Sequence, residues 1–172
     1  MIMPRGQPLL MPVRPAFIAL SLLIALALSM LPLGRVLWTP DWVLLLLLFW
    51  ALQQPGRVGM GLAFAMGLVL DVQQSALLGQ HALVYALAVF AVQAAARRLL
   101  WFGALMQALQ LAPVFVAAHL LQAALRVAGG GLLPDWTLLL APLLETLLWP
   151  LASWLLLAPQ RRPPDQDQNR PL

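Results

Sequence analysis

Residues 57–81 read RVGMGLAFAMGLVLDVQQSALLGQH, and they govern how the rest of the chain is interpreted. On a helix, Gly59, Ala63, Gly67 and Asp71 fall at successive four-residue steps, so three small side chains and one carboxylate share a face. Small residues at this spacing let two helix backbones approach closely in a bilayer. The pattern predicts a packed membrane helix first and a partner or ligand site second. Asp71 favours the partner or ligand site, because an acidic side chain within the membrane is energetically unfavourable unless it has a function.

The composition indicates a polytopic membrane protein. Of 172 residues, 62% are hydrophobic and 9% are charged, and the mean hydropathy is +0.87. A soluble domain of this length does not need so much apolar surface. The absence of cysteine excludes disulfides, thiol nucleophiles and zinc–thiolate sites. The net charge of +4 comes from arginines scattered between apolar runs, which favours membrane topology over nucleic-acid binding.

Six apolar segments are expected to form one all-α bundle of six transmembrane helices over residues 15–158. A cytoplasmic leader, 1–14, precedes it, and a disordered polar tail, 159–172, follows it. The expected spans are 16–33, 40–54, the stretch from Arg57 to a loop at 71–79, 80–96, 101–126, and a last span after Pro134-Asp135-Trp136. The apolar part of the second span, 40–52, would be about 20 Å long, against roughly 30 Å of hydrocarbon. Asp41 is expected to cap the N-terminus of this span.

The distribution of arginine predicts that both termini are cytoplasmic. Six crossings place eight arginines inside, namely Arg5, Arg14, Arg57, Arg97, Arg98, Arg161, Arg162 and Arg170, and leave Arg35 and Arg126 outside. In a rival arrangement, the short second and third segments form a re-entrant hairpin and only four segments cross. That arrangement puts Arg57 within the membrane, which is energetically unfavourable.

Few ionisable residues lie within the apolar segments. Glu145 falls near the middle of the last span, where a carboxyl group must be protonated, paired or hydrated. A structural hydrogen bond to another span, involving His119 or a glutamine, is the favoured reading, and a small-solute cavity around His119, Gln122 and Glu145 is the alternative. His81 and Tyr85, one turn apart, are expected at the outer interface. No nucleophile setting, metal-ligand motif or phosphate-binding loop occurs, so neither an enzyme nor a cofactor is predicted.

An ordered set of motifs resembles the family of rod shape-determining membrane protein MreD. The set comprises a proline–polar–tryptophan helix start at Pro40, Asp41 and Trp42; a Pro-x-Arg turn at Pro55 and Arg57; a glycine-rich helix with Gly59, Gly67 and Asp71; and a Leu-Gly-x-His-Ala-Leu stretch at 78–83 that contains Gly79 and His81. Trp149 and Pro150 also fit the family's last span. The motifs cover about residues 38–90, whereas length and hydropathy agree over nearly the whole chain.

The resemblance implies an inner-membrane component of the bacterial cell-elongation machinery. Proteins of this family work beside MreC, a bitopic periplasmic protein, and with MreB, RodA and a class B penicillin-binding transpeptidase in lateral peptidoglycan synthesis. The family's fold is similar to the substrate-binding subunits of energy-coupling-factor transporters, but a shared fold does not fix a function.

The resulting hypothesis is a non-enzymatic membrane scaffold. Its small-residue face, Gly59, Ala63 and Gly67, would pack the single span of MreC, and Asp71, Gly79 and His81 would fix the register of that contact. The alternative is a transporter subunit that binds a small solute or lipid precursor.

Overall fold

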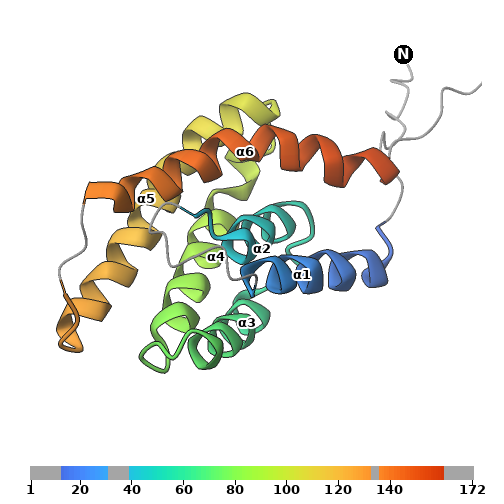
Figure 1. The fold of residues 1–172 in the computed structure, drawn as a ribbon. Helices are drawn as coiled ribbons and strands as arrows, with labels where there is room; N and C mark the ends of the chain where they lie inside the picture. Colours follow the sequence, from blue (N-terminus) through green and yellow to red (C-terminus); the bar gives the residue numbers. More distant parts are fainter. Residues whose placement is uncertain (1–12, 31–38, 133–135, 161–172) are drawn as a thin grey trace, which may run out of the picture.

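The computed structural model describes residues 13–30, 39–132 and 136–160, and the regular secondary structure of this part of the chain is all helical. Its helices are α1 (Pro15–Ser29), α2 (Trp42–Gln53), α3 (Met60–Gln73), α4 (Gln80–Leu99), α5 (Ala104–Ala128) and α6 (Leu140–Leu157), with the short 3₁₀ helices η1 (Trp136–Leu139) and η2 (Ala158–Gln160) flanking α6 (Figure 1). The predicted leader up to residue 12, the end of the first span at 31–35, Pro134-Asp135 and the tail from residue 161 lie outside the described residues. The all-α prediction is confirmed.

Helix α2 forms the buried centre of the fold. Its sequence, WVLLLLLFWALQ, is apolar on every side, and nine of its twelve side chains are buried. A helix that is apolar all round belongs in an interior, and α2 packs against α1, α4 and α6 (Figure 1). At 1.5 Å per residue it is about 18 Å long, as short as its sequence predicted.

Aromatic rings join α2 to its neighbours. Trp50 meets Phe17 of α1 edge-on, with ring centroids 5.9 Å apart, and its Nε1 donates a hydrogen bond of 2.8 Å to Ser21 Oγ. On another side of α2, Phe49 lies 6.0 Å from Trp149 of α6. These contacts fix α1 and α6 on the central helix through large buried side chains.

Two predicted boundaries around α3 and α4 are wrong. The predicted loop at 71–79 begins too early, because α3 continues to Gln73 and therefore carries Asp71 as a helical residue. Helix α4 begins at Gln80, as predicted, but extends beyond residue 96 to Leu99 and includes Arg97 and Arg98. The predicted helix ends were placed where the apolar residues stop. The hydrogen-bonded helix continues into the polar residues that follow, so it ends later.

The later helices also differ from prediction at their starts. Helix α5 begins at Ala104, after the predicted start at Trp101, and α6 follows the 3₁₀ turn η1. The polar side of α5 faces protein, because Gln107, His119 and Gln122 are buried and Gln110 is partly buried.

Within the part of the chain that the structure describes, three helical segments are long and apolar enough to cross a membrane: α4, α5 and residues 137–160, which include α6. Helices α1, α2 and α3 are apolar but shorter. A membrane protein agrees with these lengths, while multiple crossings, including the crossing of all six segments, stay a prediction.

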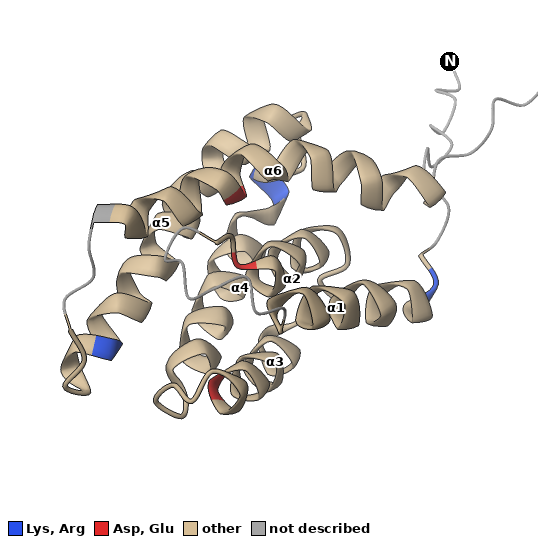
Figure 2. Ribbon diagram, in the orientation of Figure 1, with Lys and Arg blue, Asp and Glu red and all other residues tan. Residues whose placement is uncertain are grey.

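Arginines lie at helix ends (Figure 2), and hydrogen bonds connect the start of α1, the α2–α3 turn and α4. Arg57 Nη1 donates to the carbonyl of Val13 over 2.6 Å, and Gln93 Nε2 donates to the carbonyl of Val58 over 2.9 Å. The start of α1, the α2–α3 turn and the C-terminal half of α4 therefore meet on one side of the fold.

Candidate functional site

The small-residue face of α3 packs against α4 of the same chain. A Cβ atom added to Gly67 would lie 2.4 Å from both the Cα and N of Ala82, and Ala63 is fully buried. The backbones of α3 and α4 therefore touch at Gly67. This contact corrects the hypothesis that a partner helix packs at Gly67, because a short connection lets the chain's own next helix fill the groove first. At Gly59, the N-cap of α3, nothing lies within 4 Å of the Cβ position.

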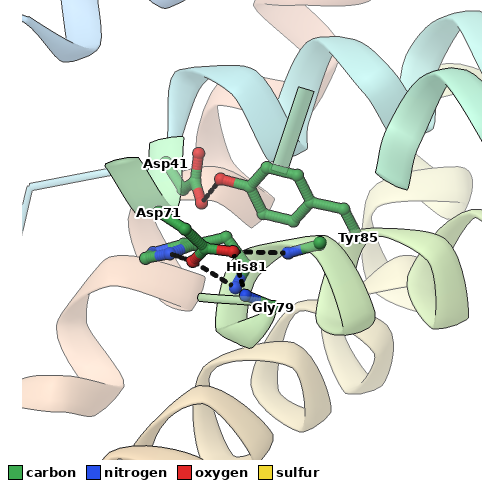
Figure 3. Close-up of polar contacts among 6 residues, drawn as sticks. Asp41, Asp71, Gly79, His81 and Tyr85 are labelled. Carbon is green, nitrogen blue, oxygen red and sulfur yellow. Dashed lines mark hydrogen bonds and ion pairs between the residues drawn. The ribbon is translucent and has the colours of Figure 1, made fainter. Parts of the chain in front are cut away.

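Asp71 closes the α3–α4 turn by capping the start of α4 (Figure 3). One carboxylate oxygen accepts from Gly79 N over 2.8 Å, and the other accepts from His81 N and His81 Nδ1, each over 2.8 Å. Backbone N–H groups at a helix start have no intrahelical acceptor, and a carboxylate there also interacts favourably with the helix dipole. Gly79 has a φ of +96°, a conformation that other residues adopt only with strain. Asp71, Gly79 and His81 therefore stabilise the turn between α3 and α4 of this chain.

Replacing Asp71 by asparagine is expected to lower the free energy of unfolding by about 1–2 kcal/mol, because one of the two acceptor oxygens becomes an NH₂ donor facing other donors. Thermal unfolding of the purified chain in detergent micelles measures this change. Ser75→Ala, in the same turn, is the matched control. Equal stability of Asp71→Asn and wild type would contradict the capping role.

A second polar cluster, Asp41, Tyr85, His119 and Glu145, joins four helices in the interior. Asp41 is the N-cap of α2, and its Oδ1 accepts from Leu44 N over 3.0 Å, which confirms the predicted cap. Its Oδ2 accepts a short hydrogen bond from the Tyr85 hydroxyl of α4 (Figure 3). His81 and Tyr85 are both buried, at 4% and 0% exposure, and their polar groups contact Asp71 and Asp41, while their position at the outer interface stays a prediction.

Glu145 ties α6 to the start of α2. Its Oε1 accepts from Asp41 N over 2.8 Å and lies 2.8 Å from His119 Nε2 of α5. When Glu145 is ionised, Oε1 accepts in both contacts and His119 donates through Nε2. The favoured reading of Glu145 as a structural hydrogen bond to another span is confirmed, and a buried carboxylate needs exactly such donors.

The alternative cavity residues are only partly brought together. Gln122 is buried on the same helix as His119, but its Nε2 has no hydrogen-bond partner among the described residues, and neither does Glu145 Oε2. Across the described ranges, no group of three or more His, Asp or Glu side chains is arranged to hold a metal ion.

The remaining motif residues have local roles. Pro40, Asp41 and Trp42 form the start of α2, Pro55 and Arg57 form the α2–α3 turn, and Trp149 and Pro150 lie within α6. Trp149 Nε1 reaches Gln107 Oε1 over 3.4 Å. These motif residues therefore have structural positions, at a helix start, in a turn and within a helix of the bundle.

An apolar groove that the sequence did not reveal lies between α1 and α6, and α2 forms its floor. Its volume is about 410 Å³. The side chains that face it include Leu20, Ile24 and Leu28 of α1 and Leu151 and Leu155 of α6, all of them exposed. We refer to it as the α1–α6 groove. Sequence alone does not distinguish leucines that line a groove from leucines that face lipid, because both lie on exposed helix faces.

Comparisons with known proteins agree with the motifs. A family model, described as rod shape-determining protein MreD, matches residues 9–158. The rod shape-determining protein MreD of Haemophilus influenzae is 31% identical over 123 residues, which cover 69% of this chain and 74% of that protein. No solved structure matches.

Proposed function

The chain belongs to the family of rod shape-determining protein MreD, and from this membership we propose that it is a non-enzymatic scaffold in the bacterial cytoplasmic membrane. Membership in this family supports a role in cell shape. The buried polar groups also support a scaffold, because Asp71 and Glu145 serve helix ends of the same chain and thereby fix its architecture.

We propose a topology of six crossings with both termini in the cytoplasm. Contacts from Arg57 to Val13 and from Gln93 to Val58 put the start of α1, the α2–α3 turn and the end of α4 on one side. Gln73 Nε2 donates to the carbonyl of Ser29 over 3.3 Å, so the ends of α1 and α3 meet as well. This alternation suits successive crossings, and the described arginines then follow the positive-inside rule, with Arg126 as the exception. The likeness to energy-coupling-factor subunits stays a prediction.

The proposed partner is MreC, whose single span we place in the α1–α6 groove. The observation that carries this proposal is the groove itself, which exposes large apolar side chains on two helices that are separated by α2. A helix inserted between α1 and α6 would pack along both, and helix association in membranes depends on such close packing. Through MreC, the chain would join the assembly that contains MreB, RodA and the class B transpeptidase.

Cysteine crosslinking tests the location. The chain has no native cysteine, so Ile24→Cys and Leu151→Cys place one thiol on each wall of the groove. Each is expected to form a disulfide with single cysteines along the span of MreC. Val69→Cys, exposed on α3, is the control and is expected to give several-fold less product. Efficient crosslinking from Val69→Cys but not from the two groove positions would show that the span of MreC contacts α3 and not the α1–α6 groove.

A specific observation supports one second candidate, a subunit that binds a small solute. Glu145 Oε2 and Gln122 Nε2 are buried acceptor and donor atoms without partners among the described residues, and polar groups of a bound molecule are one way to satisfy such atoms. A candidate solute should raise the melting temperature of the purified chain, and Gln122→Leu should abolish that increase. No increase with any solute would remove this candidate.

A further inference from the structure

A second groove lies between α4 and α5. It has a volume of about 260 Å³, and its lining includes Val84, Ala88 and Ala91 of α4 and Pro113, Val114 and Ala117 of α5. Every lining residue is apolar, and the alanines make the groove deep because their side chains are short. Ala91 and Ala117 are exposed, so the groove opens laterally toward the surroundings of the helices. We call it the α4–α5 groove.

Arg98 lies at the end of the same helix face. Val84, Ala91 and Arg98 are seven residues apart, and seven residues bring an α-helix back to within about 20° of the same direction. At 1.5 Å per residue, the Arg98 backbone lies about 10 Å beyond Ala91. The apolar groove therefore leads toward a cationic side chain.

The charge of Arg98 has no protein partner within the described residues. Arg98 is exposed, and its guanidinium makes neither a hydrogen bond nor an ion pair with another described residue. The acidic groups Asp71 and Asp41 are bound near the opposite end of α4, at His81 and Tyr85. Tyr85 is thirteen residues from Arg98, or about 20 Å along the helix. The charge of Arg98 is therefore accessible to an anion from outside the described chain.

Exposed aromatic residues follow Arg98 directly. The side chain of Trp101 is 89% exposed, and that of Phe102 is 40% exposed. Tryptophan is enriched where membrane hydrocarbon meets the headgroups. The turn between α4 and α5 therefore has the features of a segment at the level of the lipid headgroups. Arg98 precedes this turn, and the apolar groove lies between the two helices that the turn connects.

We propose that the α4–α5 groove and Arg98 together bind one anionic phospholipid. The phosphate pairs with Arg98, and one acyl chain lies against Ala88, Ala91 and Ala117. From Val84 to Arg98 the site is about 21 Å long, and half of a bilayer's hydrocarbon plus part of the headgroup layer is of similar thickness. A partner helix, about 10 Å across, is a poor occupant of so small a groove and would leave Arg98 unneutralised. This inference is independent of MreC binding, which concerns the other side of α2.

Native mass spectrometry of the purified full-length chain tests this site with phosphatidylglycerol as the probe. Phosphatidylglycerol should bind more tightly than phosphatidylcholine. Arg98→Gln should weaken its binding about fivefold, the effect expected of one arginine at a membrane surface, whereas Arg98→Lys should bind like wild type. Ala91→Leu, which fills the groove at an exposed position, should weaken binding at least as much. Arg126→Gln, at the end of α5, and Ala65→Leu, exposed on α3, are the controls and should change nothing.

Three results would overturn the proposal. Equal binding of phosphatidylglycerol and phosphatidylcholine would show that charge is not recognised. Loss of binding in Arg98→Gln but not in Ala91→Leu would show a headgroup contact without a groove. Tighter binding of a polyprenyl phosphate than of phosphatidylglycerol, with the same dependence on both residues, would assign the site to a different lipid class.

Discussion

Glu145→Leu is expected to lower the free energy of unfolding by about 3 kcal/mol, because it leaves two buried donors without an acceptor. The donors are Asp41 N at the start of α2 and His119 Nε2 on α5, and Glu145 Oε1 serves both at 2.8 Å. Leucine fills the site without leaving a cavity but accepts no hydrogen bond, so the loss reflects mainly hydrogen bonding. Denaturant titration of the purified chain in micelles measures it.

The control for this prediction is Glu145→Gln. Glutamine keeps one carbonyl oxygen in place of Oε1, so it is expected to lose about 1 kcal/mol or less. Leu143→Ala, at an exposed site on the same helix, should also have little effect. Hydrogen bonds between membrane helices often contribute less than 1 kcal/mol. A loss below that value in Glu145→Leu would show that α2 keeps its position without this carboxylate.

Gly67→Ala is expected to lower the free energy of unfolding by about 2 kcal/mol. The added methyl group would lie 2.4 Å from the backbone of Ala82, and backbone atoms cannot rotate away as a side chain can. Helices α3 and α4 must therefore separate, at a cost typical of an overpacked core. The higher helix propensity of alanine offsets about 1 kcal/mol of the packing cost, and the expected loss of about 2 kcal/mol is what remains.

Gly61→Ala is the matched control on the same helix. Nothing lies within 4 Å of its Cβ position, so this change should leave the stability unchanged or raise it by up to about 1 kcal/mol. If both substitutions behave alike, the close approach at Gly67 is not maintained in the membrane. If only Gly67→Ala also reduces MreC recovery, the loss follows from a disturbed bundle, since α4 occupies this face.

Local patterns predicted most of the helices and the capping of α2. Asp41 precedes an unbroken apolar run, and an acidic residue there accepts from the backbone two or three residues later whatever surrounds it. The end of α3 was predicted less well. The predicted loop began at Asp71 because Asp71 is polar. In the structure Asp71 is a helical residue, and its carboxylate reaches forward to accept a hydrogen bond from His81 N.

The candidate site was predicted as a set of residues but not as a set of contacts. The sequence placed Glu145 near the middle of its span and offered His119 as a partner, and the structure confirms the contact with His119. It did not indicate that Asp41 and Tyr85 belong to the same cluster. Residues 41, 85, 119 and 145 lie on four separate segments, so their proximity depends on how the helices pack.

By itself, the sequence determined that this chain is an apolar, all-helical member of its family, because composition, hydrophobic run length and ordered motifs are properties of the chain alone. Only the tertiary structure decided which helix fills each face. Small residues such as Gly67 permit a close approach by any helix, and the short α3–α4 connection gives that place to the chain's own α4. The α1–α6 and α4–α5 grooves likewise exist only after packing, because a groove is the space between helices that do not meet.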